Sequence, residues 1–181
     1  MAKKKYVDLA SIRELFSENN FEKMLEFINE YGINSLEKKT GRNILLFCIV
    51  NEKTEWAVKI SEQFKDLDVN LKARDGYSAL HYAVQARNIN VLETLLKNKE
   101  IIVDITDSYG NTPLWKAMFY TYKSELNDRD VELENIILKL LEAGADINKS
   151  NNNGIKPNKY LDEKMEKVNS FIKENKREII K

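Results

Sequence analysis

The sequence predicts an all-α protein built from stacked helical repeats, and three observations lead to this fold class. Similar segments recur along the chain, a short Asp-Ile-Asn-like landmark precedes each of them, and apolar residues between the landmarks follow a spacing near 3.6. The recurring segments are GRNILLFC, GYSALHYA, GNTPLWKA and GIKPNKYL, which begin at Gly41, Gly76, Gly110 and Gly154. Two landmarks that keep step through several copies indicate a single repeat domain over residues 1–181.

Each segment has the pattern of a tight turn followed by a helix. The glycine supplies the positive φ of the turn. Two residues later comes a side chain that can cap a helix N-terminus, namely Asn43, Ser78 or Thr112. Pro113 then stands at the first helical position, where its missing N–H costs nothing. A leucine and a small residue follow, and the small residues Cys48, Ala83 and Ala117 would let neighbouring helices approach closely.

A second helix is expected in each copy, because its apolar residues form a stripe. The stripes are Trp56, Ile60 and Phe64; Ile89, Leu92, Leu95 and Leu96; and Leu133, Ile136, Ile137, Leu140 and Leu141. Gly144 would end the last of these helices as a C-cap. Each unit therefore reads as turn, helix, helix, turn.

The spacing divides the chain into about five units. They cover residues 6–38, 39–72, 73–106, 107–150 and 151–181. The third glycine interval is longer by about ten residues, which indicates an insert near 121–131. The first and last units are expected to be caps with one polar face, because nothing stacks on the ends of the array. The last unit has Lys156 at the N-cap position and Asn158 where a leucine belongs.

These segments resemble ankyrin repeats. TPLW (112–115) and SALHYA (78–83) are similar to the T-P-L-H-x-A signature, and GADIN (144–148) is similar to the usual repeat ending. The resemblance is firm from about residue 39 to 157, with the unit at 39–72 divergent but in register. It implies a solenoid with short β-hairpin-like turns, which binds proteins through its turn tips and the exposed face of its first helices.

The composition argues against several classes of protein, namely nucleic-acid-binding, membrane-spanning and secreted proteins. Lys+Arg and Asp+Glu are both 29, so no global charge favours nucleic acid or a membrane surface. No apolar run is long enough for a membrane span, and the basic start MAKKK lacks the apolar stretch of a signal peptide. The single cysteine excludes an internal disulfide and suits a reducing compartment. We therefore expect a cytoplasmic protein. The array should be a monomer on its own if its caps work, whereas exposed aromatic residues would support self-association.

The sequence contains few candidates for catalytic or metal-binding residues. The single histidine, His81, lies at the signature position where the resemblance implies a structural residue that hydrogen bonds to turn backbone. Cys48 lies at a packing position, and no His/Cys cluster accompanies it. No nucleophile–base pair or phosphate-binding glycine motif is present. We predict no enzyme activity, no cofactor and no metal.

The surface of the third unit carries an unusual number of aromatic residues. The repeat register places Arg74, Asp75 and Tyr77 at one turn tip and Ser108, Tyr109 and Asn111 at the next. It places the exposed ends of the first helices at Val50 and Asn51, at Gln85 and Ala86, and at Phe119 and Tyr120. The predicted protein-binding residues are Tyr77, Tyr109, Asn111, Trp115, Phe119, Tyr120 and Tyr122. The alternative is that the insert covers the aromatics and forms a small satellite core, with Trp115 most buried.

The insert adds an acidic component. Asp128 and Asp130 are included among the predicted protein-binding residues, because insertions in repeat arrays often map to the binding face. Acidic residues beside aromatics would suit a partner with a basic, partly apolar surface. The alternative is a solvated loop that leads into a helix, whose first turn favours acidic residues.

The sequence therefore predicts a non-catalytic protein-binding module. The YGNTPLWKAMF segment and the short insert resemble small bacterial ankyrin proteins that act as immunity partners of secreted toxins. That resemblance implies one cognate toxin, bound tightly and neutralised. The alternative function is a general scaffold or adaptor, including an effector that binds a host protein.

Overall fold

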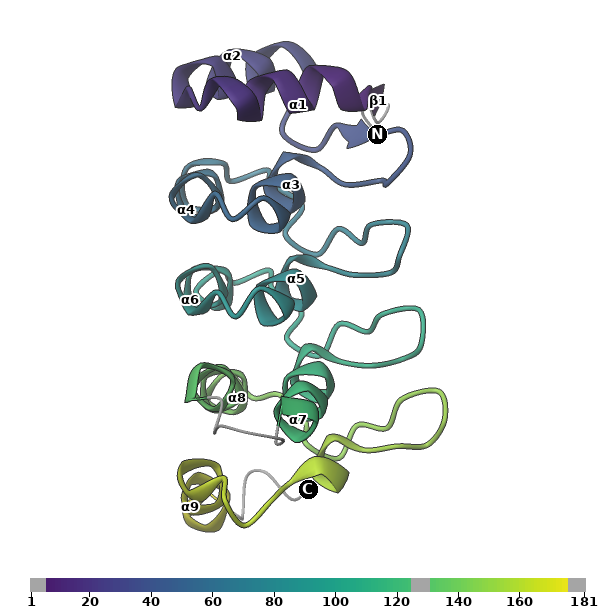
Figure 1. Cartoon of the computed structure of the whole chain (residues 1–181), viewed down its shortest axis with the longest axis vertical. Coiled ribbons are helices and arrows are strands. Elements are labelled where there is room, and N and C mark those ends of the chain that lie inside the picture. The colour runs from purple at the N-terminus through teal and green to yellow at the C-terminus, as the bar shows by residue number, and fades with distance from the viewer. Residues whose placement is uncertain (1–5, 125–130, 176–181) are drawn as a thin grey trace.

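The computed structural model describes residues 6–124 and 131–175, and its helices stack in pairs along one long axis (Figure 1). In chain order the elements are β1 (Tyr6–Val7), α1 (Leu9–Glu18), α2 (Phe21–Tyr31), β2 (Leu36–Glu37), α3 (Ile44–Val50), α4 (Thr54–Gln63), α5 (Ala79–Gln85), α6 (Ile89–Leu96), α7 (Pro113–Ser124), α8 (Val131–Glu142), the 3-10 helix η1 (Pro157–Tyr160) and α9 (Glu166–Glu174).

The pairs form two columns, and long loops project from one side of the stack (Figure 1). Along the column next to the loops, α3 contacts α5, α5 contacts α7, and α7 contacts η1. Along the outer column, α4 contacts α6, α6 contacts α8, and α8 contacts α9. The loops close as hairpins, for instance through the Ala73 amide, which donates to the Tyr77 carbonyl at 2.9 Å. The prediction of an all-α repeat solenoid is confirmed.

The predicted helix starts are confirmed, because α3, α5 and α7 begin directly after Asn43, Ser78 and Thr112. The Asn43 side-chain oxygen accepts the Leu46 amide at 3.0 Å, and α3 begins directly after it. The Thr112 hydroxyl accepts the Trp115 amide at 3.1 Å, and α7 begins at Pro113. These bonds satisfy N–H groups that have no partner inside the helix.

Two of the turn glycines are required because neighbouring hairpins touch. Gly76 and Gly110 have φ of +85° and +77°, a region that other residues rarely adopt. A Cβ on Gly76 would lie 2.6 Å from the Ser108 amide nitrogen, and one on Gly110 would lie 2.7 Å from that of Asn152. The hairpins therefore stack backbone against backbone, and this contact fixes the spacing of the tips that line the candidate site.

The core runs continuously between the helix columns. The small residues Cys48, Ala83 and Ala117 are fully buried, as their positions in the repeat predict. The apolar stripes of the outer helices are buried with them, among others Ile60, Leu92, Leu95, Leu133, Ile136 and Leu140. Because each unit buries its apolar face against its neighbours, the stability of the array depends on the contacts between adjacent units.

The two ends of the array depart from the regular unit. In the last unit the first helix is reduced to the 3-10 helix η1, whose N-cap position, Lys156, makes no side-chain cap bond. At the other end β1 pairs in parallel with β2, so that Tyr6 lies opposite Leu36 and Val7 opposite Glu37. Nothing in the sequence pattern indicated this strand pair.

The predicted insert near 121–131 begins as helix. α7 continues to Ser124, whereas α3 and α5 end after seven residues. Glu52 and Arg87, just beyond α3 and α5, have φ of 58° and 52°, which ends those helices. α8 begins at Val131, and residues 125–130 lie outside the described part of the chain.

Candidate functional site

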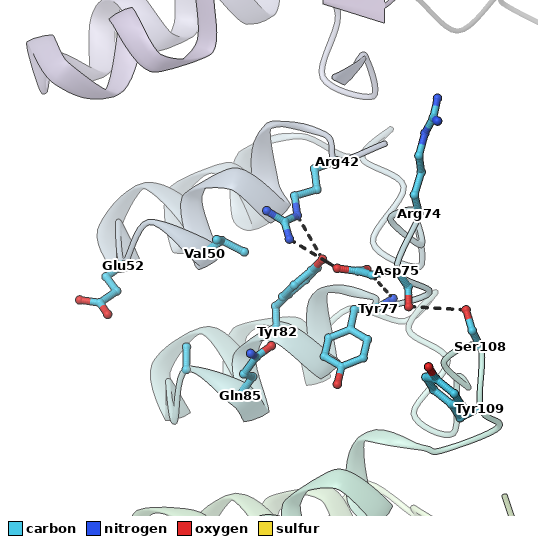
Figure 2. A pocket seen from close by; sticks show the side chains of 11 residues that line it. Arg42, Val50, Glu52, Arg74, Asp75, Tyr77, Tyr82, Gln85, Ser108 and Tyr109 are labelled. Atoms are coloured by element: carbon cyan, nitrogen blue, oxygen red, sulfur yellow. Dashed lines mark hydrogen bonds and ion pairs between the residues drawn. The ribbon is translucent and has the colours of Figure 1, made fainter. Parts of the chain in front are cut away.

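A hollow of about 690 Å³ lies between the hairpin tips and the helices next to them. Its helical wall comes from the ends of α3 and α5, at Val50, Tyr82, Gln85 and Ala86, with Glu52 just beyond α3. Its other wall comes from the hairpins, at Arg42, Arg74, Asp75, Tyr77, Ser108 and Tyr109 (Figure 2). We call the surface between the hairpins and the helix column next to them, which includes α3, α5 and α7, the inner groove. Most of these positions were placed there by the repeat register.

A polar network crosses this hollow between neighbouring units. The Tyr82 hydroxyl donates to the Asp75 carboxylate at 2.5 Å, and the Arg42 Nε donates to the Tyr82 hydroxyl at 3.1 Å (Figure 2). The Arg42 guanidinium also pairs with Asp75 at 3.4 Å and lies 5.0 Å from the centre of the Tyr82 ring. Burial and the hydrogen bond to Asp75 raise the pKa of Tyr82 well above its usual range, so its hydroxyl remains a donor.

Tyr77 lies beside this network at the tip of its hairpin, half-buried. Its ring stacks on His81 with centroids 5.3 Å apart, and the Lys116 ammonium lies 5.0 Å from its centre. Burial raises the pKa of Tyr120 to about 12, and a hydrogen bond with the Tyr77 hydroxyl adds to this shift. Two predicted contact residues, Tyr77 and Tyr120, are thus brought together and held in fixed orientations.

The next hairpin is organised by a buried carboxylate. Asp107 accepts the amides of Tyr109 at 2.8 Å and Asn111 at 2.9 Å, and it pairs with Lys116 at 3.3 Å. Burial disfavours the charge, but the hydrogen bonds from Asn111 and Tyr109 outweigh it and lower the pKa of Asp107. The Asn111 side chain is buried and bonded to Asp107 and Asn151. It therefore shapes the hairpin from within.

His81 and Trp115 perform the same structural task in successive units. The His81 Nδ1 accepts the Ser78 amide at 3.3 Å, so its Nε2–H donates to the Asn111 carbonyl at 3.0 Å. The Trp115 indole N–H donates to the Ile155 carbonyl at 3.0 Å. Each acceptor is the residue that follows a hairpin glycine in the next unit. The structural role implied for His81 is confirmed, and the tryptophan replaces the histidine without loss of the bond.

The aromatic residues of α7 are covered in part, and the cover comes from the C-terminal unit. Trp115 is buried and stacks on Phe119 with centroids 5.1 Å apart. Tyr160 of η1 packs edge-on against both rings, at 5.3 Å from Trp115 and 5.5 Å from Phe119. Tyr122 lies 5.5 Å from Tyr160 and keeps 49% of its surface exposed. Phe119 and Tyr120 are half-buried, because Phe119 packs against Tyr160 and Tyr120 bonds to Tyr77.

Exposure separates the described predicted contact residues into three groups, of which the first, Tyr77, Phe119 and Tyr120, is half-buried. Tyr109 and Tyr122 are exposed, with 67% and 49% of their surface accessible. Asn111 and Trp115 are buried and support the hairpins instead. Asp128 and Asp130 lie outside the described residues.

The sequence interpretation missed three contributors. Arg42 follows Gly41 as Tyr77 follows Gly76, so the repeat register could have placed it at a tip. Tyr82 stands next to His81 on a seven-residue helix, which is too short for the pattern to show which side faces the groove. Tyr160 lies in the irregular last unit, where no repeat template places it.

The described residues hold no group of three or more His, Cys, Asp or Glu side chains that could bind a metal ion. The Cys48 thiol is buried, and burial raises its pKa above the usual range. Among the helices of residues 6–124 and 131–175, none is long and apolar enough to cross a membrane.

Comparison with known proteins gives the family. The family model described as ankyrin repeats (3 copies) matches residues 12–102 and 57–151. The chain therefore belongs to the ankyrin-repeat family, and this repeat forms protein–protein interaction modules that are generally non-catalytic.

One relative is a probable serine/threonine-protein kinase of Dictyostelium discoideum, which is 33% identical over 105 residues. The match covers 58% of this chain and 10% of the kinase. It falls on the repeats, so the likeness extends to a repeat segment within a much larger protein.

Proposed function

We propose that the chain binds a partner protein through the inner groove, with Tyr109 and Arg74 as the main contact residues. The observation that carries this proposal is the exposure of Tyr109, 67%, at the rim of a hollow whose other walls are fixed by hydrogen bonds. Tyrosine and arginine are enriched in the few residues that dominate binding energy at interfaces. The Arg42–Asp75–Tyr82 network keeps the groove walls in place, which reduces the ordering cost of binding.

The finer proposal is that the partner is a cognate bacterial toxin and that this chain is its cytoplasmic immunity protein. Its support is the resemblance of the YGNTPLWKAMF segment, which contains Trp115 and Phe119, to small bacterial immunity proteins. An immunity protein has one tight partner, whereas an adaptor binds several partners with modest affinity. The number of partners therefore separates the two functions.

The test is affinity capture from the native cells with identification of bound proteins by mass spectrometry. The variant is Arg74→Ala/Tyr109→Ala, since both side chains are exposed and their loss should leave the fold intact. Its matched control is Lys65→Ala/Ile102→Ala, which removes an exposed cation and an exposed large apolar side chain that do not line the groove. Phe119→Ala and Tyr120→Ala are poor probes, because their rings are packed against Tyr160 and Tyr77.

One stoichiometric partner, captured by the wild type and the control but lost in the variant, is the expected result. Growth arrest when that partner is expressed alone, with rescue on co-expression of this chain, would support the immunity function. Several weakly bound proteins would favour an adaptor. Equal capture by the groove variant would show that the binding surface lies elsewhere.

A further inference from the structure

A second hollow, of about 530 Å³, extends the inner groove toward the N-terminus between α1 and α3. It shares the lining residues Arg42 and Val50 with the first hollow, so the two hollows adjoin. Its floor is apolar, with Phe47 buried, Phe16 half-buried and Val50 40% exposed. This part of the groove was not indicated by the aromatic pattern of the third unit.

The charges that line this second hollow have one sign. Arg13, Arg42 and Lys53 line it, and no carboxylate of the described residues does so. Glu52 and Asp75 line the first hollow instead, and Asp75 is already paired with Arg42. The Glu37 carboxylate lies behind the lining residue Thr40, whose hydroxyl donates to it at 2.7 Å. The charges of Arg13 and Lys53 are therefore not balanced within the hollow.

Lys53 is held in place by neutral groups. Its ammonium donates to the Asn19 side-chain oxygen at 2.7 Å and lies 5.5 Å from the centre of the Trp56 ring. Neither neighbour is a carboxylate, so the lysine stays available for an anionic group. A fixed, unbalanced cation at the edge of an apolar floor favours a ligand that carries carboxylates beside aliphatic side chains.

We propose that this second hollow binds an acidic, partly apolar segment of the partner protein, with carboxylates at Arg13 and Lys53 and an aliphatic side chain on Val50. The proposal rests on the proposed function, because it assigns the chemistry of one part of the same binding groove. A nucleic acid suits the hollow less well: Phe47 is buried, and Phe16 packs against Trp56 with ring centroids 5.6 Å apart. Phe47 therefore offers no face for base stacking, and the half-buried Phe16 ring is engaged by Trp56.

This partner chemistry differs from the basic surface expected on account of Asp128 and Asp130. Those two residues lie outside the described part of the chain, whereas the cations of the second hollow lie within it. A locally acidic segment in the groove is compatible with a partner that is basic elsewhere.

The test uses three short fluorescent peptides that share a leucine pattern and carry glutamate, glutamine or lysine at the remaining positions. Binding is followed by fluorescence anisotropy at low and high salt, and amide shifts in NMR spectra locate the bound peptide. We expect the glutamate peptide to bind more tightly than the glutamine peptide by about tenfold, which corresponds to two exposed ion pairs. The preference should shrink at high salt, because exposed pairs are screened.

Charge reversal provides the decisive variants. In Arg13→Glu/Lys53→Glu the preference should switch to the lysine peptide, and Arg13→Gln/Lys53→Gln should remove the preference altogether. The control Lys65→Glu/Lys99→Glu makes the same change in net charge at exposed positions outside the hollow and should keep the preference for glutamate. The glutamine variant keeps the test valid if the charge reversal disturbs folding.

Equal binding of the three peptides, an equal loss in the control, or tighter binding of oligothymidylate would overturn the proposal. A separate result would contradict the proposed function itself, so the two failures can be distinguished. If the captured partner is lost in Arg74→Ala/Tyr109→Ala but retained in Arg13→Glu/Lys53→Glu, the groove binds protein and only the acidic-segment assignment is wrong.

Discussion

At the residue scale, the cap of α3 has an unsatisfied donor. The Asn43 side chain is 1% exposed, and its oxygen caps the helix while its Nδ2 is the one buried side-chain nitrogen or oxygen of the described residues without a hydrogen-bond partner. An unpaired buried donor costs free energy that a hydroxyl at the same position would avoid. The equivalent residues in the next two units, Ser78 and Thr112, are hydroxyl residues.

We therefore predict that Asn43→Thr raises the free energy of unfolding by about 1 kcal/mol, because it keeps the cap and removes the unpaired N–H groups. Urea denaturation of the two proteins measures the difference. Asn43→Ala, which removes the cap as well, is the control and should be less stable than Asn43→Thr. A threonine variant less stable than the wild type would show that the Nδ2 group is satisfied in solution.

The stability of the protein should depend on pH through His81, and the burial of its ring sets the sign of that dependence. Burial lowers its pKa below the ordinary 6.5, partly offset by the hydrogen bond to the Asn111 carbonyl and the charge of Asp107. Below pH 6.5 the unfolded chain binds a proton that the folded chain does not. Stability is therefore complete above 6.5 and is lost as pH falls toward the folded-state pKa, by up to about 1.4 kcal/mol per pH unit.

Because His81 is the only histidine, its ring signals in an NMR titration are unambiguous and should show a midpoint below 6.5. Urea denaturation should show a loss of stability between pH 7.5 and 5.5 that is smaller in His81→Gln. A midpoint at or above 6.5 would mean that the ring is solvated or charged in the fold.

At the element scale, a ladder of side chains joins the loops that follow the outer helices. Asn34 accepts the Asp68 amide at 2.8 Å and donates to the Asp66 carbonyl at 2.7 Å. Asn70 likewise accepts the Ile102 amide at 2.9 Å and donates to the Glu100 carbonyl at 2.7 Å. In the next unit Asp104 accepts the Asp146 amide at 3.1 Å but, as a carboxylate, has no N–H to donate.

We predict that Asp104→Asn stabilises the protein by about 1 kcal/mol at neutral pH. Burial raises the pKa of Asp104, so its ionised form is a cost that appears as pH rises through that pKa. Urea denaturation measures the gain, and the reverse exchange Asn70→Asp should destabilise. If the two substitutions had the same sign, the ladder would not be the cause.

The elements show where sequence reasoning succeeds and where it stops. The helix starts at Asn43 and Thr112 follow from local chemistry, which a sequence displays directly. The burial of Trp115 depends on Tyr160, which belongs to a unit with no repeat pattern to place it. The parallel pair of β1 and β2 joins segments far apart in the chain through backbone bonds, which side-chain patterns do not encode.

The candidate site also has features that the sequence predicts and features that it does not. The repeat register placed Arg74, Tyr77 and Tyr109 at tips that do line one hollow. The register does not tell which tip residues are occupied by hydrogen bonds to the next unit. Asn111 was therefore expected at the surface but is buried, and the Arg42–Tyr82 bond was not foreseen.

At the scale of the whole molecule, the solenoid depends on contact between successive hairpins (Figure 1). We predict that Gly110→Ala destabilises more than Gly154→Ala. Both glycines have positive φ, which costs alanine about 1–2 kcal/mol. Only at Gly110 would the added Cβ meet the next hairpin, 2.7 Å from the Asn152 nitrogen, whereas nothing lies within 4 Å at Gly154.

The clash should add at least about 1 kcal/mol, the usual scale of overpacking, in urea denaturation of the two variants. Equal losses would mean that the hairpins separate freely and that the groove lacks the fixed walls on which the proposed binding depends.

The central claim is that the inner groove is the surface that binds a partner protein. The most direct measurement is hydrogen–deuterium exchange of this chain alone and in complex with the protein captured from native cells. We predict added protection at residues 74–77 and 108–109 and at the ends of α3 and α5, which line the groove. Protection confined to the outer helices α4, α6 and α8 would contradict the claim.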